Sequence, residues 1–182
     1  MIRLFFIIII VFSTAAFDTE EQVYFIQKGA IIFKSNAPLE RIEARSEGLK
    51  GAIDIKKRTF AFTIDILSFD GFNNPLQKTH FNENYMESTE HAQASFIGKI
   101  IEKTDLSQDG EFTLRAKGKL KIHGVEQERI IKSRVRIKDG VLSLNAFFTV
   151  FLKEHDIMIP KIVQQKISQE IQVSVQAELL RK

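Results

Sequence analysis

Histidine is the side chain of this sequence best suited to metal binding or acid–base chemistry, because the chain contains no cysteine. The four histidines are His80, His91, His123 and His155. No two of them have the i,i+2 or i,i+4 spacing that would place two ligands on one side of a strand or a helix. The spacing therefore predicts no metal site. His80 and His91 fall in or beside a long irregular segment, where a polar role at the mouth of a binding site and an ordinary loop position both stand open.

Acidic and hydroxyl side chains form no recognisable catalytic pattern. The acidic residues considered are Asp65, Glu83, Glu87 and Glu90. The serines considered are Ser68, Ser88 and Ser95. The acids do not form an acid–base pair, and the serines lack the glycine-flanked setting of a nucleophile elbow. No glycine-rich loop would cradle a phosphate. We therefore expect a protein that is not an enzyme and uses no cofactor.

The elements that position these side chains are mainly strands, because apolar and polar residues alternate along most of the chain. Between Glu111 and Val125, apolar side chains from Phe112 to Ile122 alternate with charged ones, which is typical of a strand with one buried and one solvated face. Similar patterns predict strands over residues 30–35, 39–46, 48–55, 59–66, 93–103, 127–138, 141–151 and 171–179. Alternation on one face favours antiparallel pairing, since buried parallel strands are apolar on both faces.

The connections between these strands differ in length. Asp109–Gly110 and Asp139–Gly140 predict tight hairpin turns, and Gly124 predicts another turn. Gly98 predicts a bulge or bend within its strand. Residues 70–90 show no period of two, so they predict a long loop with one or two helical turns.

The pattern of hairpins is typical of a sandwich or an up-and-down barrel. The first and last strands are both half apolar and lack edge-protecting proline, so pairing them with each other would remove two edges. We therefore predict an all-β fold: an antiparallel up-and-down β-barrel of about eight strands, with a long loop or short helix inserted after the fourth strand. A barrel of about eight strands is just wide enough to hold one slender ligand.

The first 16 residues are typical of an export signal. Arg3 provides a positive charge, Leu4 to Phe12 form a short apolar run, and small residues follow from Ser13 to Ala16. A membrane anchor is the alternative, but a spanning helix needs about 20 apolar residues. Without cysteine, the lipoprotein route is closed. We predict a signal peptide over residues 1–16, a β-barrel domain over 17–182, and a periplasmic or secreted location.

The composition favours an apolar interior over a polar cleft. The 182 residues include 16 Phe, 2 Tyr and no Trp, and Phe supplies bulk without a polar group. The net charge of +3 is too small to indicate nucleic-acid binding. Alternation places one set of apolar side chains inside the barrel, namely Phe60, Phe62, Ile64, Phe112, Leu114, Leu142, Leu144, Phe148, Val173 and Val175. This set either lines a ligand tunnel or fills a packed core.

Three stretches of the sequence, taken in order, resemble a known family. "PLQKTHFNENYMESTEHAQASF" matches a histidine-containing loop and the strand after it, with His80 as the loop histidine; "GKLKIHGV" matches a hairpin; and "FLKEHDIMIP" followed by "ISQEIQVSVQAEL" matches a closing loop and last strand. The family is the YceI-like family, and the resemblance spans residues 22–179. Residues 76–79 stand where that family often has an Arg-Asp pair, and His91–Ala92 replaces its usual Tyr-Pro.

The resemblance implies an exported, lipocalin-like barrel whose tunnel holds a polyisoprenoid or a similar lipid chain. We accordingly expect a lipid-binding protein that holds a long isoprenoid or fatty-acyl chain for transport, storage or scavenging. The expected ligand-binding residues are the inward apolar set and His80. The expected partners are a long-chain apolar lipid and an anionic membrane surface; the oligomeric state stays open.

A basic outer face is the feature that this resemblance does not explain. It comprises Arg115, Lys117, Lys119, Lys121, Lys132, Arg134 and Arg136. Like charges that face each other across a strand pair cost stability, so this face is a candidate contact for anionic lipid headgroups. The alternative is a solvated face neutralised by Glu111, Glu126 and Glu128. A second hypothesis for function is a non-catalytic interaction module of the cell envelope that uses this face or residues 70–90.

Overall fold

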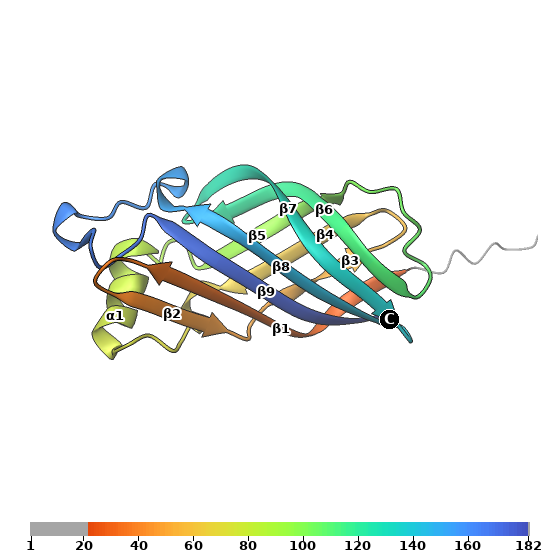
Figure 1. Cartoon of the computed structure of the whole chain (residues 1–182), viewed down its shortest axis with the longest axis horizontal. Helices are drawn as coiled ribbons and strands as arrows, with labels where there is room; N and C mark the ends of the chain where they lie inside the picture. The colour runs from red at the N-terminus through yellow and green to blue at the C-terminus, as the bar shows by residue number, and fades with distance from the viewer. Residues whose placement is uncertain (1–21, 182) are drawn as a thin grey trace, which may run out of the picture.

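The computed structural model describes residues 22–181, which are mainly antiparallel strands (Figure 1). Within this range nine strands form one sheet. They are β1 (Val23–Asn36), β2 (Arg41–Ser46), β3 (Lys50–Asp54), β4 (Thr59–Asp65), β5 (Gln93–Ile100), β6 (Gly110–Ile122), β7 (Val125–Lys138), β8 (Val141–Phe151) and β9 (Glu170–Arg181). The helical turns are η1 (Ile66–Ser68), α1 (Pro75–His80), η2 (Phe81–Tyr85), η3 (Leu152–His155) and η4 (Lys161–Val163). Among these residues, no helix has the length and apolar character to span a bilayer. The predicted signal peptide lies outside the described residues.

The sheet closes on itself because β1 pairs with β9, from Tyr24 opposite Arg181 to Ser35 opposite Ile171. The other edge of β1 pairs with two strands in turn, with β2 along residues 31–36 and with β3 along residues 23–25. The described chain therefore forms a closed antiparallel barrel of eight strands with one additional strand. This confirms the predicted fold. Closure satisfies the backbone groups that an open sheet would expose at β1 and β9.

The segment between β4 and β5 completes the barrel wall beside β2. The backbone of Asp70 exchanges two hydrogen bonds with Arg45 of β2, at 2.7 and 2.9 Å. Asn74 then caps α1, because its side-chain oxygen accepts a hydrogen bond from the backbone N–H of Gln77 at 2.9 Å, and Pro75 begins the helix. The π-helical turn η2 continues α1. Figure 1 shows α1 at one end of the barrel, and the predicted insertion after the fourth strand is confirmed.

Two of the three predicted turns are confirmed. His123–Gly124 joins β6 to β7 and Asp139–Gly140 joins β7 to β8, and all four residues have positive φ, between 50 and 76°. Two consecutive left-handed residues define a type I′ turn, whose twist matches that of the strands it joins. The hairpin predicted at Asp109–Gly110 is wrong. β5 ends at Ile100 and β6 begins at Gly110, so residues 101–109 form a longer connection.

Gly98 does not form the predicted bulge. It lies in continuous register, opposite Phe60 of β4 and Gly118 of β6. A Cβ atom on Gly98 would meet the carbonyl oxygen of Lys117 and would lie 2.5 Å from Cα of Gly118. This glycine pair therefore permits a close approach of two strand backbones. The first strand is also longer than predicted, since it begins at Val23 and contains a register shift between Ile26 and Lys28 that interrupts the alternation.

The interior is packed at one end of the barrel and looser at the other. Along β7, Ile131, Ser133, Val135 and Ile137 are buried while the residues between them are exposed. At the end away from α1, the packed core includes Ile53, Phe60, Leu114, Ile137, Leu142 and Leu179. At the end that carries α1, a smaller cluster includes Ile66, Met86, Leu152, Ile157 and Ile159. Because packing is looser there, the barrel has internal space at the end that carries α1.

Candidate functional site

A cavity of about 500 Å³ lies inside the barrel at the end that carries α1. Its volume is within the range of small-molecule sites, roughly 300–1,000 Å³. The strands contribute an almost wholly apolar lining, which includes Ile31, Phe33, Ile64, Leu120, Ile122, Phe148, Val150 and Val173. The cavity reaches the surface beside α1, where the lining residue Leu76 is 61% exposed.

Two smaller cavities continue the first one toward the packed end. The second, of about 110 Å³, shares Ile31, Ile64, Ala94, Leu120 and Phe148 with the first. The third, of about 30 Å³, shares Phe62, Ala116, Ser133 and Leu144 with the second. Because each cavity shares its wall with the next, the three form an interrupted apolar tunnel whose constrictions are side chains.

Four phenylalanines form an aromatic cluster that lines one side of the large cavity. Phe33 of β1 lies 5.3 Å from Phe69, 5.9 Å from Phe72 and 5.2 Å from Phe81, measured between ring centroids. Phe72 and Phe81 are 5.1 Å apart. Such ring pairs contribute about 0.5–1.5 kcal/mol each beyond their buried area. They hold the segment after β4 against the barrel and give the cavity an apolar wall there.

The cavity lining also includes a few polar side chains, several of them near its mouth. Glu40 accepts a hydrogen bond from Nε2 of Gln77 at 2.9 Å, and both residues belong to the cavity lining together with His80. Lys166 lines the mouth from the connection between β8 and β9. Tyr85 lies deeper, and burial raises the pKa of its phenol, so the hydroxyl stays protonated and available as a donor.

The predicted ligand-binding residues are distributed over all three cavities. Ile64, His80, Phe148 and Val173 line the large cavity. The second cavity contacts Phe62, Ile64, Leu144, Phe148 and Val175. The third, at the packed end, is lined by Phe60, Phe62, Leu114, Leu142 and Leu144. Phe112 lies outside these linings and packs against the core beside Gly110. Several of the predicted residues therefore form the packed end.

The prediction omitted the residues that the connecting segments contribute. Phe69, Phe72 and Phe81 come from the segment after β4, and Ile157 and Ile159 come from the segment after β8. Neither segment alternates with a period of two, so the reasoning that found the strands could not assign these side chains an inward direction. The sequence indicates these residues only through composition, because bulky apolar residues recur in segments that are expected to be loops.

Four of the seven residues of the basic face form ion pairs. Lys117 pairs with Glu128 at 3.0 Å, and Lys119 pairs with Glu126 at 2.9 Å. Arg115 and Arg136 likewise contact Glu102 and Glu111. The strand register places Glu128 opposite Lys119 and Glu126 opposite Lys121. Each glutamate pairs diagonally, with the lysine two residues before the one it faces. Glu111, Glu126 and Glu128 thus each pair with one basic residue of this face, as the alternative of a neutralised face expects.

One group of potential metal ligands among the described residues lies next to two residues of the cavity lining, Met86 and Ile122. Glu87, His91 and His123 bring three donor atoms within 4.8 Å of one another. The spacing between histidines gives no signal for this group, whereas Glu87 and His91 are four residues apart. His123 joins them only through the fold.

The closed barrel and its apolar internal cavities define a class of protein, the hollow lipocalin-like β-barrel. A family model described as the YceI-like domain matches residues 26–179, and the chain therefore belongs to the YceI-like family. This confirms the resemblance found in the sequence. No curated protein matches the chain.

Solved structures with the same fold include three bacterial proteins. A structure described as a polyisoprenoid binding domain from Saccharophagus degradans, implicated in plant cell wall breakdown, has a TM-score of 0.75 and 13% identity, over 89% of this chain and 100% of that one. BcnA of Burkholderia cenocepacia has a TM-score of 0.68 and 14% identity, over 82% and 95%. The Campylobacter jejuni YceI protein has a TM-score of 0.59 and 14% identity, over 76% and 84%. At these identities the similarity concerns the fold.

Proposed function

We propose that this protein binds one long apolar lipid chain, of the isoprenoid or fatty-acyl type, inside its barrel. The observation that carries the proposal is the row of three apolar cavities with shared walls. The similarity to a barrel described as a polyisoprenoid binding domain supports it. The lining along the axis is mainly apolar, so it offers bulk and dispersion contacts to an apolar chain.

The energetics favour long chains over short ones. Burial of each methylene contributes about 0.8 kcal/mol, so ten of them contribute about 8 kcal/mol. Association costs an estimated 4–15 kcal/mol in lost freedom. A chain that fills only part of the large cavity therefore binds weakly, whereas one that extends into the second cavity gains the additional burial that tight binding needs.

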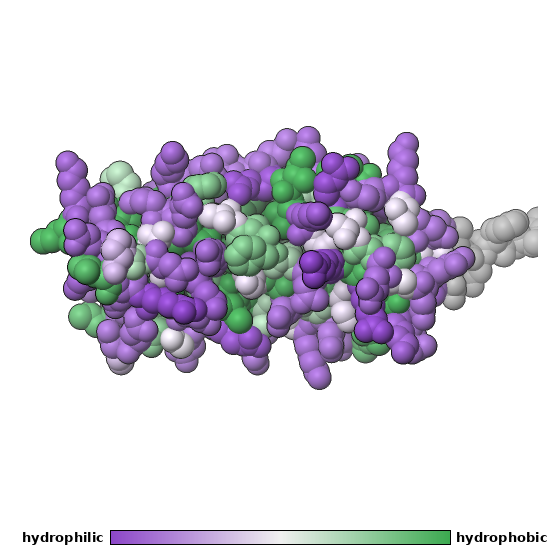
Figure 2. Space-filling view, in the orientation of Figure 1, coloured by the Kyte–Doolittle hydropathy of each residue, from purple (hydrophilic) through white to green (hydrophobic). Residues whose placement is uncertain are grey.

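The polar residues at the mouth orient the ligand. Glu40, Gln77, His80 and Lys166 can contact a hydroxyl, amide or phosphate head group, while the tail enters the apolar interior. Two apolar side chains at the same end are highly exposed, Met158 at 85% and Ile162 at 91%. They could contact the apolar part of a membrane while a lipid enters or leaves the barrel. Figure 2 shows apolar side chains projecting at this end of the molecule.

We further propose that the protein is exported and carries or stores its lipid in the periplasm or outside the cell. Support for export comes from the first 16 residues of the sequence. The alternative, an envelope interaction module that uses the basic face, has less support because Arg115, Lys117, Lys119 and Arg136 are paired with acids.

Native mass spectrometry with lipid extraction tests the proposal, together with a variant that blocks the tunnel. Ala94 lines both the large and the second cavity, so Ala94→Phe should reduce the amount of co-purified long-chain lipid at least 10-fold. The control is Ala61→Phe, the same change at an exposed position on β4. Absence of lipid from the wild-type protein, combined with failure to bind an added C30 or longer prenyl alcohol, would refute the proposal.

A further inference from the structure

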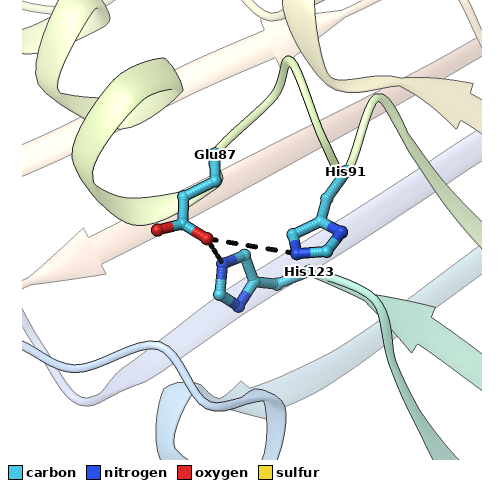
Figure 3. A group of neighbouring side chains, drawn as sticks. All are labelled: Glu87, His91 and His123. Carbon is cyan, nitrogen blue, oxygen red and sulfur yellow. Dashed lines mark hydrogen bonds and ion pairs between the residues drawn. The ribbon is translucent and has the colours of Figure 1, made fainter.

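Outside the cavity lining, the side chains of Glu87, His91 and His123 point toward one another (Figure 3). Glu87 and His91 belong to the turn between η2 and β5, and His123 belongs to the β6–β7 turn. Oε2 of Glu87 lies 3.0 Å from Nε2 of His123 and 4.0 Å from Nε2 of His91. Two imidazole nitrogens and one carboxylate oxygen therefore meet from two separate turns.

The hydrogen bond on the far side of the His123 ring determines what Nε2 presents. Nδ1 lies 3.0 Å from the carbonyl oxygen of His155. A carbonyl oxygen can only accept, so Nδ1 carries the proton and donates it. In the neutral ring, Nε2 then directs a lone pair at the carboxylate of Glu87, and two acceptors 3.0 Å apart repel each other. A cation relieves this repulsion, either as a proton on Nε2 or as a metal ion between the two atoms.

The same arrangement is typical of histidines that bind metal. A metal-bound imidazole usually donates its other N–H to a backbone carbonyl or a carboxylate, which sets its tautomer and its orientation. Zn²⁺ binds histidine nitrogen and carboxylate oxygen at about 2.0–2.2 Å, so neighbouring ligand atoms in a tetrahedral site lie about 3.4 Å apart. The distances of 3.0 and 4.0 Å to Oε2 of Glu87 bracket this value.

The β6–β7 turn is built to admit both rings. Its type I′ geometry, with φ of 50° at His123 and 74° at Gly124, directs His123 toward the turn that carries Glu87. A Cβ on residue 124 would lie 2.8 Å from Cε1 of His91, so glycine makes room for that ring. The two imidazole rings are 4.6 Å apart between centroids and meet edge to face. The side chain of Glu87 is 51% exposed, so an ion reaches the group from solvent.

We propose that Glu87, His91 and His123 form a site for a divalent transition-metal ion of the Zn²⁺ class. The ligands are Oε2 of Glu87 and Nε2 of each histidine, and three protein ligands leave a fourth position for water or another donor. The ion links the turn before β5 to the β6–β7 turn. Met86 and Ile122, the chain neighbours of Glu87 and His123, line the large cavity, so the ion stabilises one wall of that cavity.

Isothermal titration of the chelator-treated, untagged full chain with Zn²⁺ tests this inference without any lipid. We expect one Zn²⁺ per chain, a higher melting temperature with Zn²⁺, and visible absorption bands of a low-coordinate site with Co²⁺. His91→Gln and His123→Asn should each weaken binding at least 10-fold. Asn suits position 123 because it tolerates the left-handed backbone of a type I′ turn.

Glu87→Gln is a further variant, and it should fold normally because the side chain of residue 87 is exposed. Glu90→Gln serves as the matched control for Glu87→Gln, since Glu90 is an exposed acid of the same turn outside the group. Circular dichroism checks that each variant is folded. Binding that is unchanged in His91→Gln and His123→Asn would place the ion elsewhere and overturn the inference. Absence of Zn²⁺ binding by the wild-type chain would also overturn it.

Discussion

At the scale of single residues, His155 is a titratable side chain that the fold buries in the protein interior. The residue is 1% exposed. Its Nδ1 lies 3.2 Å from the carbonyl oxygen of Val125 and donates to it, while Nε2 has no hydrogen-bond partner among the described residues. Burial is the main cause that lowers the pKa of His155 from its ordinary value of 6.5, so the ring is neutral in the folded protein.

This burial makes stability depend on pH. The pKa of His155 is lower in the folded than in the unfolded protein. The contribution of His155 to the free energy of unfolding is therefore fully present above pH 6.5 and is lost as the pH falls below 6.5. His155→Gln retains a donor for Val125 and cannot titrate. We expect the free energy of unfolding of the wild type to fall more than that of this variant between pH 7.5 and 5.0, as measured by urea titration. His80→Gln is the control, and equal pH dependence of wild type and His155→Gln would contradict the assignment.

At the scale of elements, the β5–β6 pair depends on two glycines that face each other. Gly98 and Gly118 are directly opposite, and a Cβ on either would meet the backbone of the other strand. Backbone cannot rotate away as a side chain can, so relief would require the two strands to separate. The pair thus keeps β5 and β6 close in the middle of the barrel wall.

Substitution of Gly98 by Ala should therefore destabilise the protein by about 2–3 kcal/mol, as for an overpacked core. The measurement is chemical denaturation monitored by circular dichroism. Gly110→Ala is the matched control, because its Cβ would meet only the ring of Phe112, at 2.9 Å, and a ring can move. Similar losses in the two variants would show that the contact with the strand backbone is unimportant.

At the scale of the whole molecule, the barrel combines a packed end with a hollow end. Phe148 stands between the large and the second cavity and lines both. Its neighbour Phe147 points outward and is 62% exposed. Two adjacent phenylalanines of β8 thus face opposite sides of the barrel wall. The same substitution at each position separates the effect of changing the tunnel from the effect of losing a phenylalanine.

We expect Phe148→Ala to join the two cavities and shift the preferred ligand toward longer or bulkier chains. The variant should lose about 2–3 kcal/mol of stability without ligand, because a large half-buried side chain is removed. Competition among prenyl alcohols of increasing length, read by native mass spectrometry, measures the preference. Phe147→Ala should behave as the wild type, and an unchanged length preference in Phe148→Ala would argue that lipid does not reach the second cavity.

Much of the fold was predictable because alternation is a local property. The alternation of apolar and charged side chains predicts strands over residues 111–122 and 127–138, and the structure has strands there. The dipeptide Asp139–Gly140 is enough to predict the turn that follows. The errors fall where a distant partner decides the structure. Gly98 predicts a bulge when the sequence is taken alone, because its partner, Gly118, is identified only once the strands are paired.

The sequence by itself determined which side chains of most strands face the interior, because a period of two dictates which face of each strand avoids water. The pairing of β1 with β9 that closes the barrel is a property of the tertiary structure. Only the tertiary structure decided which inward side chains fill the core, such as Leu114 and Leu142, and which border a cavity, such as Phe148. It also decided that Glu87, His91 and His123 meet. The physical reason is that packing density and ligand geometry depend on distances between segments remote in the chain, and no local pattern records those distances.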